Sequence, residues 1–261
     1  MSIHEEPVTL VVGLGEVGNP LFTILKRREP GTVGIDIEPS LVDKPIGIMH
    51  ICFPYIDSVQ FQSAVVGYVL KYDPKVVVIN STAVPGTTRS IETETGIPCV
   101  YSPVRGKHTK MVDELLTYIK FVAGTDQEAS EKVREHFKAA GMKSETMSTP
   151  EALELAKLLE TTYFGLLIAW AQEMNRFAET VNADYLEVGK FFSEIAYLPK
   201  VLFQPGTIGG HCVMPNIGLL QTRFQSEFLE VITRSNETRK TELTAQEHES
   251  AGERLKPLAL A

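Results

Sequence analysis

Cysteine is scarce in this chain of 261 residues, which contains only three: Cys52, Cys99 and Cys212. They are widely spaced, odd in number and never arranged as a Cys-x-x-Cys pair. A secreted disulfide scaffold needs an even and denser set of cysteines, and a structural zinc site needs paired thiolates. The sequence therefore predicts neither a disulfide framework nor a metal site.

Positive charge is also in short supply. Lys and Arg number 25 against 33 Asp and Glu, which gives a net charge of −8. A nucleic-acid surface requires a basic stripe, so no nucleic-acid partner is expected. No apolar run reaches the length of a membrane span, and residues 1–7 are polar and acidic, unlike a secretory signal. We expect a cytoplasmic protein with no membrane partner.

The first half of the chain alternates short apolar runs with segments of helical spacing. Strands are predicted at Val8–Val12, Thr32–Ile37, Ile46–Phe53, Val76–Asn80, Pro98–Tyr101 and Ile119–Ala123. Helices are predicted at Gly18–Arg28, Ile56–Tyr72 and Glu128–Ala140. This alternation is typical of α/β proteins. We predict that residues 1–148 form a Rossmann-type domain, with a doubly wound parallel sheet.

A long helix is predicted at the start of the second half. Thr149 has the position of an N-cap and Pro150 that of the first helical residue. From Glu151 to Val181 apolar residues recur over a wide arc, which indicates a helix buried on two sides. We therefore predict an all-α dimerisation domain at residues 149–240, built on this central helix, and a homodimer.

The rest of the second half has weaker patterns. A short helix is predicted at Tyr185–Ser193 and a longer one at Ile217–Arg239, with a loop-rich stretch between them. Residues 241–261 are polar and have no apolar face to bury. We predict that this tail is disordered.

A glycine motif, Gly13-Leu14-Gly15-Glu16-Val17-Gly18, follows the first predicted strand and opens the first helix. In dinucleotide-binding units, such glycines allow a tight turn, close approach of a pyrophosphate and close helix–strand packing. Asp36, at the end of the second strand, could accept hydrogen bonds from a ribose diol and would repel a 2′-phosphate. The motif therefore favours NAD over NADP, with Gly13, Gly15, Glu16, Val17, Gly18 and Asp36 as its contacts. A methyltransferase that binds S-adenosylmethionine, or a turn without a ligand, fits less well.

A hydroxyl-rich segment, Ser81 to Thr88, follows the fourth predicted strand at the edge where α/β proteins bind ligands. Ser81 and Thr82, with Pro54 after the third strand, are further candidates for cofactor binding. Alternatively, Thr87 or Thr88 caps the next helix. Both interpretations can hold together.

A third motif is Gly209-Gly210-His211-Cys212, which predicts a thiol in a glycine-hinged turn. Glycines let the backbone pass close to another surface, so Gly209, Gly210 and His211 are candidates for substrate contact. Most free cysteines are inert small hydrophobes. Cys212 is therefore either a nucleophile beside the nicotinamide or part of a structural hinge.

Together these motifs resemble the UDP-glucose/GDP-mannose dehydrogenase family of nucleotide-sugar dehydrogenases. The similarity runs from about residue 8 to 240, in the family's order and spacing, through Val11–Gly18, Gly34–Asp36, Ser81–Thr88, Tyr101–Pro103, Glu154–Glu160, Gly209–Cys212 and Phe228–Glu237. The resemblance implies an N-terminal Rossmann domain and a dimer formed on the long central helix. It also implies a C-terminal nucleotide-binding domain, which would begin where this chain ends.

By the same resemblance, the enzyme would oxidise an alcohol with two NAD molecules in turn. Cys212 would capture the aldehyde as a thiohemiacetal, and a second hydride transfer would leave a thioester for water to cleave. Lys157 would stabilise the oxyanion.

Three positions depart from the family's pattern. Asn216 stands where an aspartate is expected, and an amide cannot act as a general base. Thr161 stands for an asparagine one turn after Lys157, and Val104 for an acidic residue after Ser102-Pro103. The catalytic candidates are thus Cys212, Lys157, Asn216 and Thr161.

A group of basic residues follows Val104. Arg105, Lys107 and His108 would suit an anionic small-molecule substrate, although they could also form a solvated loop.

Three functions therefore remain open. The first is an NAD-dependent oxidoreductase of this family that acts on a sugar or a small acid. The second is a non-catalytic or regulatory NAD-binding protein, which fits the lost acidic residues. The third is a hydroxyacid dehydrogenase that uses Lys157 only. We favour the first, because a protein without catalysis has no reason to keep a glycine-hinged thiol.

Overall fold

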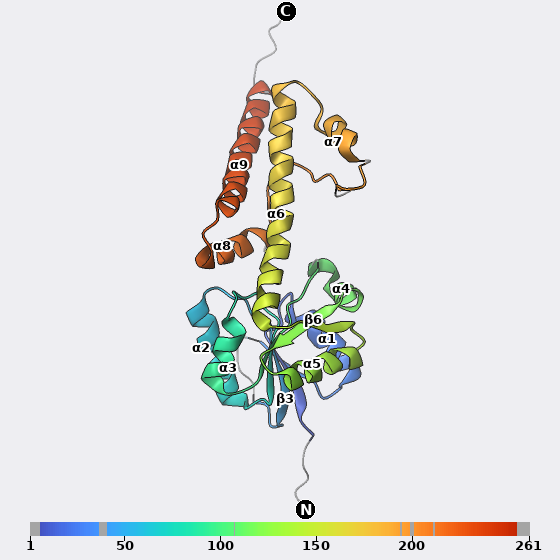
Figure 1. The fold of residues 1–261 in the computed structure, drawn as a ribbon, viewed down its shortest axis with the longest axis vertical. Helices are drawn as coiled ribbons and strands as arrows, with labels where there is room; N and C mark the ends of the chain where they lie inside the picture. The colour runs from blue at the N-terminus through green and yellow to red at the C-terminus, as the bar shows by residue number, and fades with distance from the viewer. Residues whose placement is uncertain are drawn as a thin grey trace, which may run out of the picture. The chain divides into compact units, whose positions relative to one another are not determined.

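The computed structural model describes residues 6–36, 41–106, 108–193, 195–198, 201–210 and 212–254. The chain divides into two compact units, Met1–Leu158 and Leu159–Ala261. The division falls inside helix α6 (Pro150–Thr180), whereas the sequence analysis placed the boundary in front of that helix. Figure 1 shows the elements of each unit.

The first unit contains a seven-stranded sheet in the order β2-β1-β3-β4-β5-β6-β7. Its strands are β1 (Val8–Val12), β2 (Val33–Ile35), β3 (Ile46–Ile51), β4 (Val76–Ile79), β5 (Cys99–Tyr101), β6 (Lys120–Gly124) and β7 (Ser144–Thr146). The strand order reverses between β1 and β3, as in doubly wound sheets. The predicted Rossmann-type α/β class is confirmed.

Two features of the sheet differ from the prediction. Strand β6 runs antiparallel to β5, because the chain between them turns back at the carboxyl edge through η1 (His108–Lys110) and α4 (Met111–Thr117). That short helix was not predicted. Strand β7, also missed, reads Ser-Glu-Thr and has no apolar pattern. Only its pairing with β6 makes it a strand.

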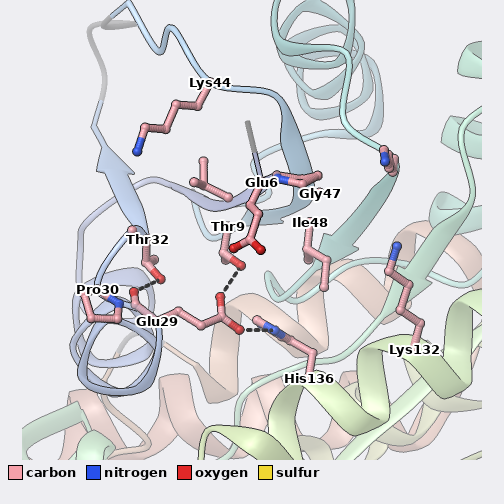
Figure 2. A pocket seen from close by; sticks show the side chains of 14 residues that line it. Glu6, Thr9, Glu29, Pro30, Thr32, Lys44, Gly47, Ile48, Lys132 and His136 are labelled. Atoms are coloured by element: carbon pink, nitrogen blue, oxygen red, sulfur yellow. Dashed lines mark hydrogen bonds and ion pairs between the residues drawn. The ribbon is translucent and has the colours of Figure 1, made fainter. Parts of the chain in front are cut away.

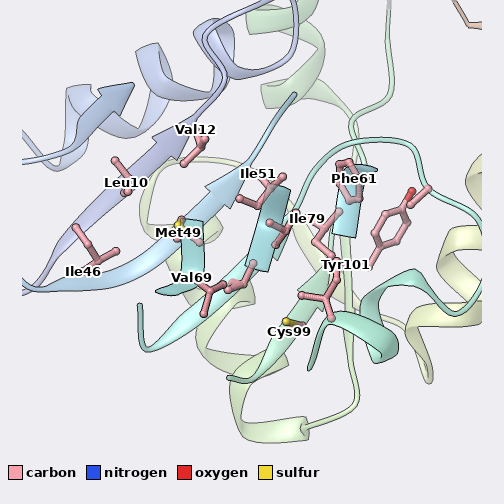
Figure 3. Packing of buried hydrophobic residues seen from close by; sticks show 14 of the residues in the cluster. Leu10, Val12, Ile46, Met49, Ile51, Phe61, Val69, Ile79, Cys99 and Tyr101 are labelled. Carbon is pink, nitrogen blue, oxygen red and sulfur yellow. The ribbon is translucent and has the colours of Figure 1, made fainter. Parts of the chain in front are cut away.

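Helices cover both faces of the sheet. One face carries α1 (Gly18–Arg28), α4 and α5 (Gln127–Ala139), and the other carries α2 (Ser58–Tyr72) and α3 (Thr87–Thr95) (Figure 1). A separate apolar cluster fills each interface. Figure 3 shows the cluster that lies beneath α2 and α3, with Met49, Ile51 and Ile79 at its centre. Burial on both faces explains why the central strands are apolar along their whole length.

Helix α3 is capped by a residue far away in the sequence. Its N-cap is Gly86 rather than Thr87 or Thr88, so the helix has no capping side chain of its own. The fully buried carboxylate of Glu154 accepts hydrogen bonds from Gly86 N at 2.6 Å and from Thr88 N at 2.9 Å. It also accepts one from Thr88 Oγ1 at 2.7 Å. The first turns of α6 are thereby fixed to the first unit.

The second unit is helical, as predicted. It contains the rest of α6, α7 (Tyr185–Ser193), α8 (Val213–Arg223) and α9 (Glu227–Arg254), and α9 lies alongside α6 (Figure 1). The start of α6 follows the prediction, since Thr149 Oγ1 accepts a hydrogen bond from Ala152 N at 3.2 Å.

The predicted helix Ile217–Arg239 was wrong, because the segment forms two helices. α8 begins at Val213 and includes Pro215 in its first turn, where the missing N–H of proline leaves no partner unsatisfied. It ends at Arg223, and the backbone of the next residue, Phe224, is extended.

The prediction of a disordered tail was also wrong for residues 241–254, which belong to α9. Glu242 forms ion pairs with Arg176 of α6 at 2.6 Å and with Arg239 at 3.1 Å. These pairs hold a polar segment that has no apolar face of its own. Residues 255–261 lie outside the described part of the chain.

Candidate functional site

The glycine loop between β1 and α1 has the geometry expected of a phosphate-binding turn. Gly13 has φ +89°, and a Cβ there would lie 2.9 Å from the Phe53 nitrogen. A Cβ on Gly18 would lie 1.7 Å from the Gly13 carbonyl oxygen. A Cβ on Gly15, by contrast, would have nothing within 4 Å among the described residues. The first and third glycines are thus required by packing, and the second leaves open space.

The N-terminus of α1 faces this open space. Its first turn has no acidic residue and no side-chain cap. Unsatisfied N–H groups at a helix N-terminus attract phosphate groups. Of the two other predicted residues in the loop, Glu16 is exposed and Val17 is half-buried.

Asp36 lies beside the same loop. It follows β2, its side chain is exposed, and its Oδ1 accepts a hydrogen bond from Leu14 N at 3.3 Å. The sequence could place Asp36 at the end of a strand, but only the fold brings its carboxylate to the glycine loop. That is the position from which a carboxylate could contact an adenosine ribose.

The loops after β3 and β4 meet next to the glycine loop. Ser81 Oγ donates a hydrogen bond to the Phe53 carbonyl at 2.6 Å, so this hydroxyl connects the two loops. Pro54 is exposed and Thr82 is half-buried. Within the described residues, the Thr82 hydroxyl makes no hydrogen bond and is available to a ligand.

The predicted basic cluster is only partly visible. Arg105 is half-buried; its Nη2 donates to the Ile119 carbonyl at 2.6 Å, and its guanidinium lies 5.1 Å from the Phe121 ring centre. Val104 is buried. Lys107 lies outside the described residues, and the side chain of His108 is not described. Arg105 is thus the one member of the cluster whose side chain is placed.

A lysine that the sequence analysis did not single out lies buried at the carboxyl edge of the sheet. Lys120 is only 3% exposed and donates hydrogen bonds to Asn80 Oδ1 at 3.0 Å and to the carbonyl oxygens of Ser102 and Pro103. Burial, with the positive charges of Arg105 and Lys157, lowers the pKa of Lys120 to about 7. The predicted Lys157, half-buried on α6 and still within the first unit, is therefore close enough to influence this edge.

The second unit brings three of the predicted catalytic residues together. Cys212 is half-buried and is the N-cap of α8. Asn216 lies one turn later, and its backbone N–H donates to the Cys212 carbonyl at 3.0 Å. The buried Asn216 Nδ2 donates to Thr161 Oγ1 at 2.9 Å. Two of the three positions that depart from the family's pattern, Asn216 and Thr161, are therefore hydrogen-bonded to each other.

Buried polar residues that the sequence analysis did not single out support the glycine turn. Asn236, which is fully buried, exchanges two hydrogen bonds with the Ile208 backbone, at 2.7 and 3.2 Å. Gln172 Nε2 donates to the Gly206 carbonyl at 2.7 Å. Gly210 has φ +82°, which favours glycine. His211 lies outside the described residues. A polar residue in a helix pattern gives no sequence signal for such a role.

The described residues contain no group of three or more His, Cys, Asp or Glu side chains that could hold a metal ion. Among the same residues, no helix is long and apolar enough to span a membrane.

Comparisons with known proteins identify relatives of both units. Residues 151–238 match the profile of the UDP-glucose/GDP-mannose dehydrogenase family, central domain. A UDP-N-acetyl-D-mannosamine dehydrogenase from Methanococcus maripaludis is 24% identical over 253 residues, covering 78% of this chain and 58% of its own length. One from Methanocaldococcus jannaschii is 26% identical over 143 residues, covering 52% of this chain and 33% of its own. The chain thus spans less than two thirds of these relatives.

Solved structures share the fold. A UDP-D-ManNAc dehydrogenase from Pyrococcus horikoshii superposes with a TM-score of 0.82 at 18% identity, over 94% of this chain and 72% of the other. The Mycobacterium tuberculosis 3-hydroxyisobutyrate dehydrogenase gives a TM-score of 0.69 at 14% identity, over 91% of this chain and 94% of the other. Residues 151–238 therefore resemble the central domain of the UDP-glucose/GDP-mannose dehydrogenase family, and the chain shares its fold with the solved dehydrogenase structures.

Proposed function

We propose that the chain is an NAD-dependent dehydrogenase that oxidises an alcohol on a sugar nucleotide or a similar anionic small molecule. The observation that carries the proposal is the open space at Gly15, between the uncapped N-terminus of α1 and the Asp36 carboxylate. This arrangement fits a dinucleotide, with the pyrophosphate on the loop and the ribose at Asp36. The printed names of the relatives suggest UDP-N-acetyl-D-mannosamine as the first substrate to test.

We assign roles to the residues that the sequence analysis singled out. Gly13, Gly15, Glu16, Val17 and Gly18 form the pyrophosphate turn, and Asp36, Pro54, Ser81 and Thr82 surround the rest of the cofactor. Bound NAD would supply the hydride acceptor. Arg105, with Lys107 and His108, would attract the anionic part of the substrate. Gly209, Gly210 and His211 would approach its sugar.

The chemical step falls to Lys157 and Cys212. The Lys157 ammonium would stabilise negative charge on the substrate oxygen as the alcohol becomes an aldehyde. The Cys212 thiol, at the start of α8, would then add to that aldehyde, a role that suits a half-exposed thiol. Asn216 donates to Thr161 and has no carboxylate, so it would orient groups rather than accept a proton. We therefore propose that oxidation ends at the aldehyde level.

A second candidate is a dehydrogenase that uses Lys157 without any covalent step. It is favoured by the same Asn216–Thr161 hydrogen bond, because Asn216 is an amide and cannot accept a proton from the thiol. Alkylation of Cys212 separates the two, since in the first case it would release the aldehyde that the thiol otherwise holds, and in the second it would leave the reaction unchanged.

Calorimetry with NAD and NADP tests cofactor choice. We expect NAD to bind at least about tenfold more tightly, because the Asp36 carboxylate would meet the 2′-phosphate of NADP. Asp36→Ala should narrow this gap, and Asp57→Ala, which removes a carboxylate from the cap of α2, should leave it unchanged. Equal affinities for the two cofactors in the native protein would contradict the assignment of Asp36.

We also propose a homodimer formed on α6. Four apolar residues follow each other at spacings of four or seven residues on this helix and are each about half exposed, at 49–56%: Leu159, Tyr163, Trp170 and Phe177. Phe228 and Val231 of the neighbouring α9 are exposed as well. An apolar stripe of this kind is typical of a helix that packs against another helix.

Sedimentation of two matched variants tests the dimer. Trp170→Asp should weaken association by about a hundredfold, because aromatic residues often dominate such interfaces. Leu70→Asp changes an even more exposed apolar residue on α2 and should have no effect. A native protein that sediments as a monomer at micromolar concentration would refute the proposal.

A further inference from the structure

A line of polar side chains crosses the face of the sheet that lies beneath α1 and α5. Its five members come from five different elements: Lys120, Asn80, His50, His136 and Glu29. The first four are at most 9% exposed and lie among the apolar residues of that face. Buried polar groups of this number are unfavourable unless each has a partner. We therefore asked which partner each of these buried groups has.

The line is continuous from one edge of the sheet to the other. The successive distances are 3.0 Å from Lys120 Nζ to Asn80 Oδ1, 3.2 Å from Asn80 Nδ2 to His50 Nδ1, 3.1 Å from His50 Nε2 to His136 Nε2, and 3.2 Å from His136 Nδ1 to Glu29 Oε1. Glu29 lies in a cavity of about 640 Å³ at the amino edge, and Figure 2 shows its carboxylate between His136 and Thr9. This end of the line is the one that solvent reaches.

With Lys120 charged, the donors and acceptors can be assigned in one direction only. An ammonium can only donate, so Asn80 must turn Oδ1 toward Lys120 and Nδ2 toward His50. His50 Nδ1 then accepts, and its single proton lies on Nε2. His136 Nε2 accepts that proton's hydrogen bond, and His136 Nδ1–H donates to the Glu29 carboxylate. Each link depends on the previous one.

The inner end of the line is Lys120, which lies at the carboxyl edge of the sheet. Asn80 directly precedes Ser81, and Pro103, whose carbonyl also accepts from Lys120, directly precedes Val104. Three acceptors surround Nζ, which matches the three N–H groups of an ammonium. Lys120 thus connects the loops after β4 and β5, where the proposed cofactor and substrate contacts lie.

We propose that these five residues form a hydrogen-bond relay through which protonation of His136, at the amino edge, repositions the loops after β4 and β5. A proton that enters from the cavity onto His136 Nε2 would face the Nε2–H of His50. The contact is relieved when the single proton of His50 moves to Nδ1. Asn80 must then turn its amide, so that Nδ2 faces Lys120 and the bond between them is lost. In total the protein gains one proton.

The surroundings of the two imidazoles support this order of events. Burial, followed by the charges of His136 and Lys120, lowers the pKa of His50 well below its ordinary value, so His50 keeps one proton. The hydrogen bond from His136 lowers the pKa of Glu29, so its carboxylate stays an acceptor. The charged and titratable groups around His136 are Glu29, His50, Glu6, Lys44, Lys75 and Lys132.

Nuclear magnetic resonance on the ¹⁵N-labelled full chain tests the relay without any ligand. At about pH 8 we expect the Nε2–H tautomer of His50 and the Nδ1–H tautomer of His136. As the pH falls to about 5.5, the amide signals of Ser81 and Val104 should shift with the same midpoint as the His136 ring. The opposite tautomers, or amide signals that do not follow His136, would overturn the proposal.

Matched variants separate the relay from other titrations. His136→Gln should remove the amide transition, and Lys132→Gln, which changes a charge one turn away on α5, should leave it in place. A transition that persists in His136→Gln belongs to Lys120 itself and would also overturn the proposal. Should His136→Gln fail to fold, Glu29→Gln serves instead. It removes the carboxylate that stabilises a charged His136, so the amide midpoint should move to lower pH, and an unchanged midpoint would count against the relay.

A second readout rests on the proposed function. The affinity for NAD should fall about tenfold between pH 8 and pH 5.5 in the native protein and should stay constant in His136→Gln. Asn80→Asp can accept from Lys120 whichever nitrogen of His50 carries the proton, so its affinity for NAD should stay constant between the two pH values. If no NAD binds at any pH, the proposed function fails, while the resonance experiment still decides on the relay. If NAD binds equally well at both pH values, the coupling is refuted.

Discussion

The two units of this chain use buried polar groups in different ways. In the first, apolar strands define the loops at the sheet edge, and a single polar line crosses the core. In the second, α6 and α9 pack through buried Gln172, Asn236 and Arg239, and the thiol stands beside an Asn216–Thr161 hydrogen bond. The glycine loop follows its motif closely, whereas Asn216 and Thr161 depart from the pattern that the resemblance implies and are hydrogen-bonded to each other.

The cysteines provide the largest contrast between the units. Burial raises the pKa of Cys52 to about 12 and raises that of Cys99 further, whereas Cys212 is half-exposed. At pH 8 only about one Cys52 thiol in ten thousand would be ionised. We expect iodoacetamide to modify Cys212 about a thousandfold faster than the other two, as measured by mass spectrometry of the peptides. Comparable rates at all three sites would show that the first unit opens more readily than its packing indicates.

Two substitutions in the glycine loop distinguish an effect on stability from an effect on NAD binding. Gly18→Ala places a Cβ 1.7 Å from the Gly13 oxygen, so we expect a loss of about 3 kcal/mol in unfolding free energy and about a hundredfold in NAD affinity. Gly15→Ala meets no described atom within 4 Å. It should leave the melting temperature unchanged but weaken NAD binding about tenfold, because it fills the space meant for the pyrophosphate. Calorimetry and thermal unfolding of both variants decide the point. A Gly15→Ala variant that binds NAD normally would remove the pyrophosphate from this loop.

Glu154 tests how the start of α6 is held. Its buried carboxylate accepts three hydrogen bonds at the N-terminus of α3; burial raises the pKa of Glu154, and these bonds offset only part of that rise. Glu154→Ala leaves these donors unsatisfied and should lower the unfolding free energy by about 3 kcal/mol in urea denaturation. Glu94→Ala, at an exposed position of the same α3, should change it by less than about 0.5 kcal/mol. Similar losses for the two variants would mean that Glu154 has no special role.

Asn216→Asp tests whether a missing carboxylate near Cys212 limits turnover. It restores a carboxylate that can take up a proton, so NADH formation from UDP-N-acetyl-D-mannosamine should rise about tenfold, with some loss of stability from the buried charge. Asn216→Ala removes the bond to Thr161 without adding a base and serves as the control. Equal gains from both variants would attribute the effect to a loosened helix rather than to proton transfer.

Several features were determined by the sequence itself. The glycine motif, the runs of β-branched residues and the Thr149-Pro150 start predicted the Rossmann-type sheet and the long α6, because these signals depend on local backbone geometry and on apolar periodicity. The same signals failed where local preference was weak. Strand β7 has no apolar pattern, and the end of α9 depends on ion pairs with Arg176 and Arg239.

Only the tertiary structure decided which polar groups meet. Glu154 caps α3 from 66 residues away, and His50 and His136 are 86 residues apart in the chain yet 3.1 Å apart in space. The sequence also gave no reason to connect Thr161 with Asn216, which are separated by 55 residues. Hydrogen bonds of this kind depend on distances that the packing of whole elements sets, and no local pattern of residues encodes them.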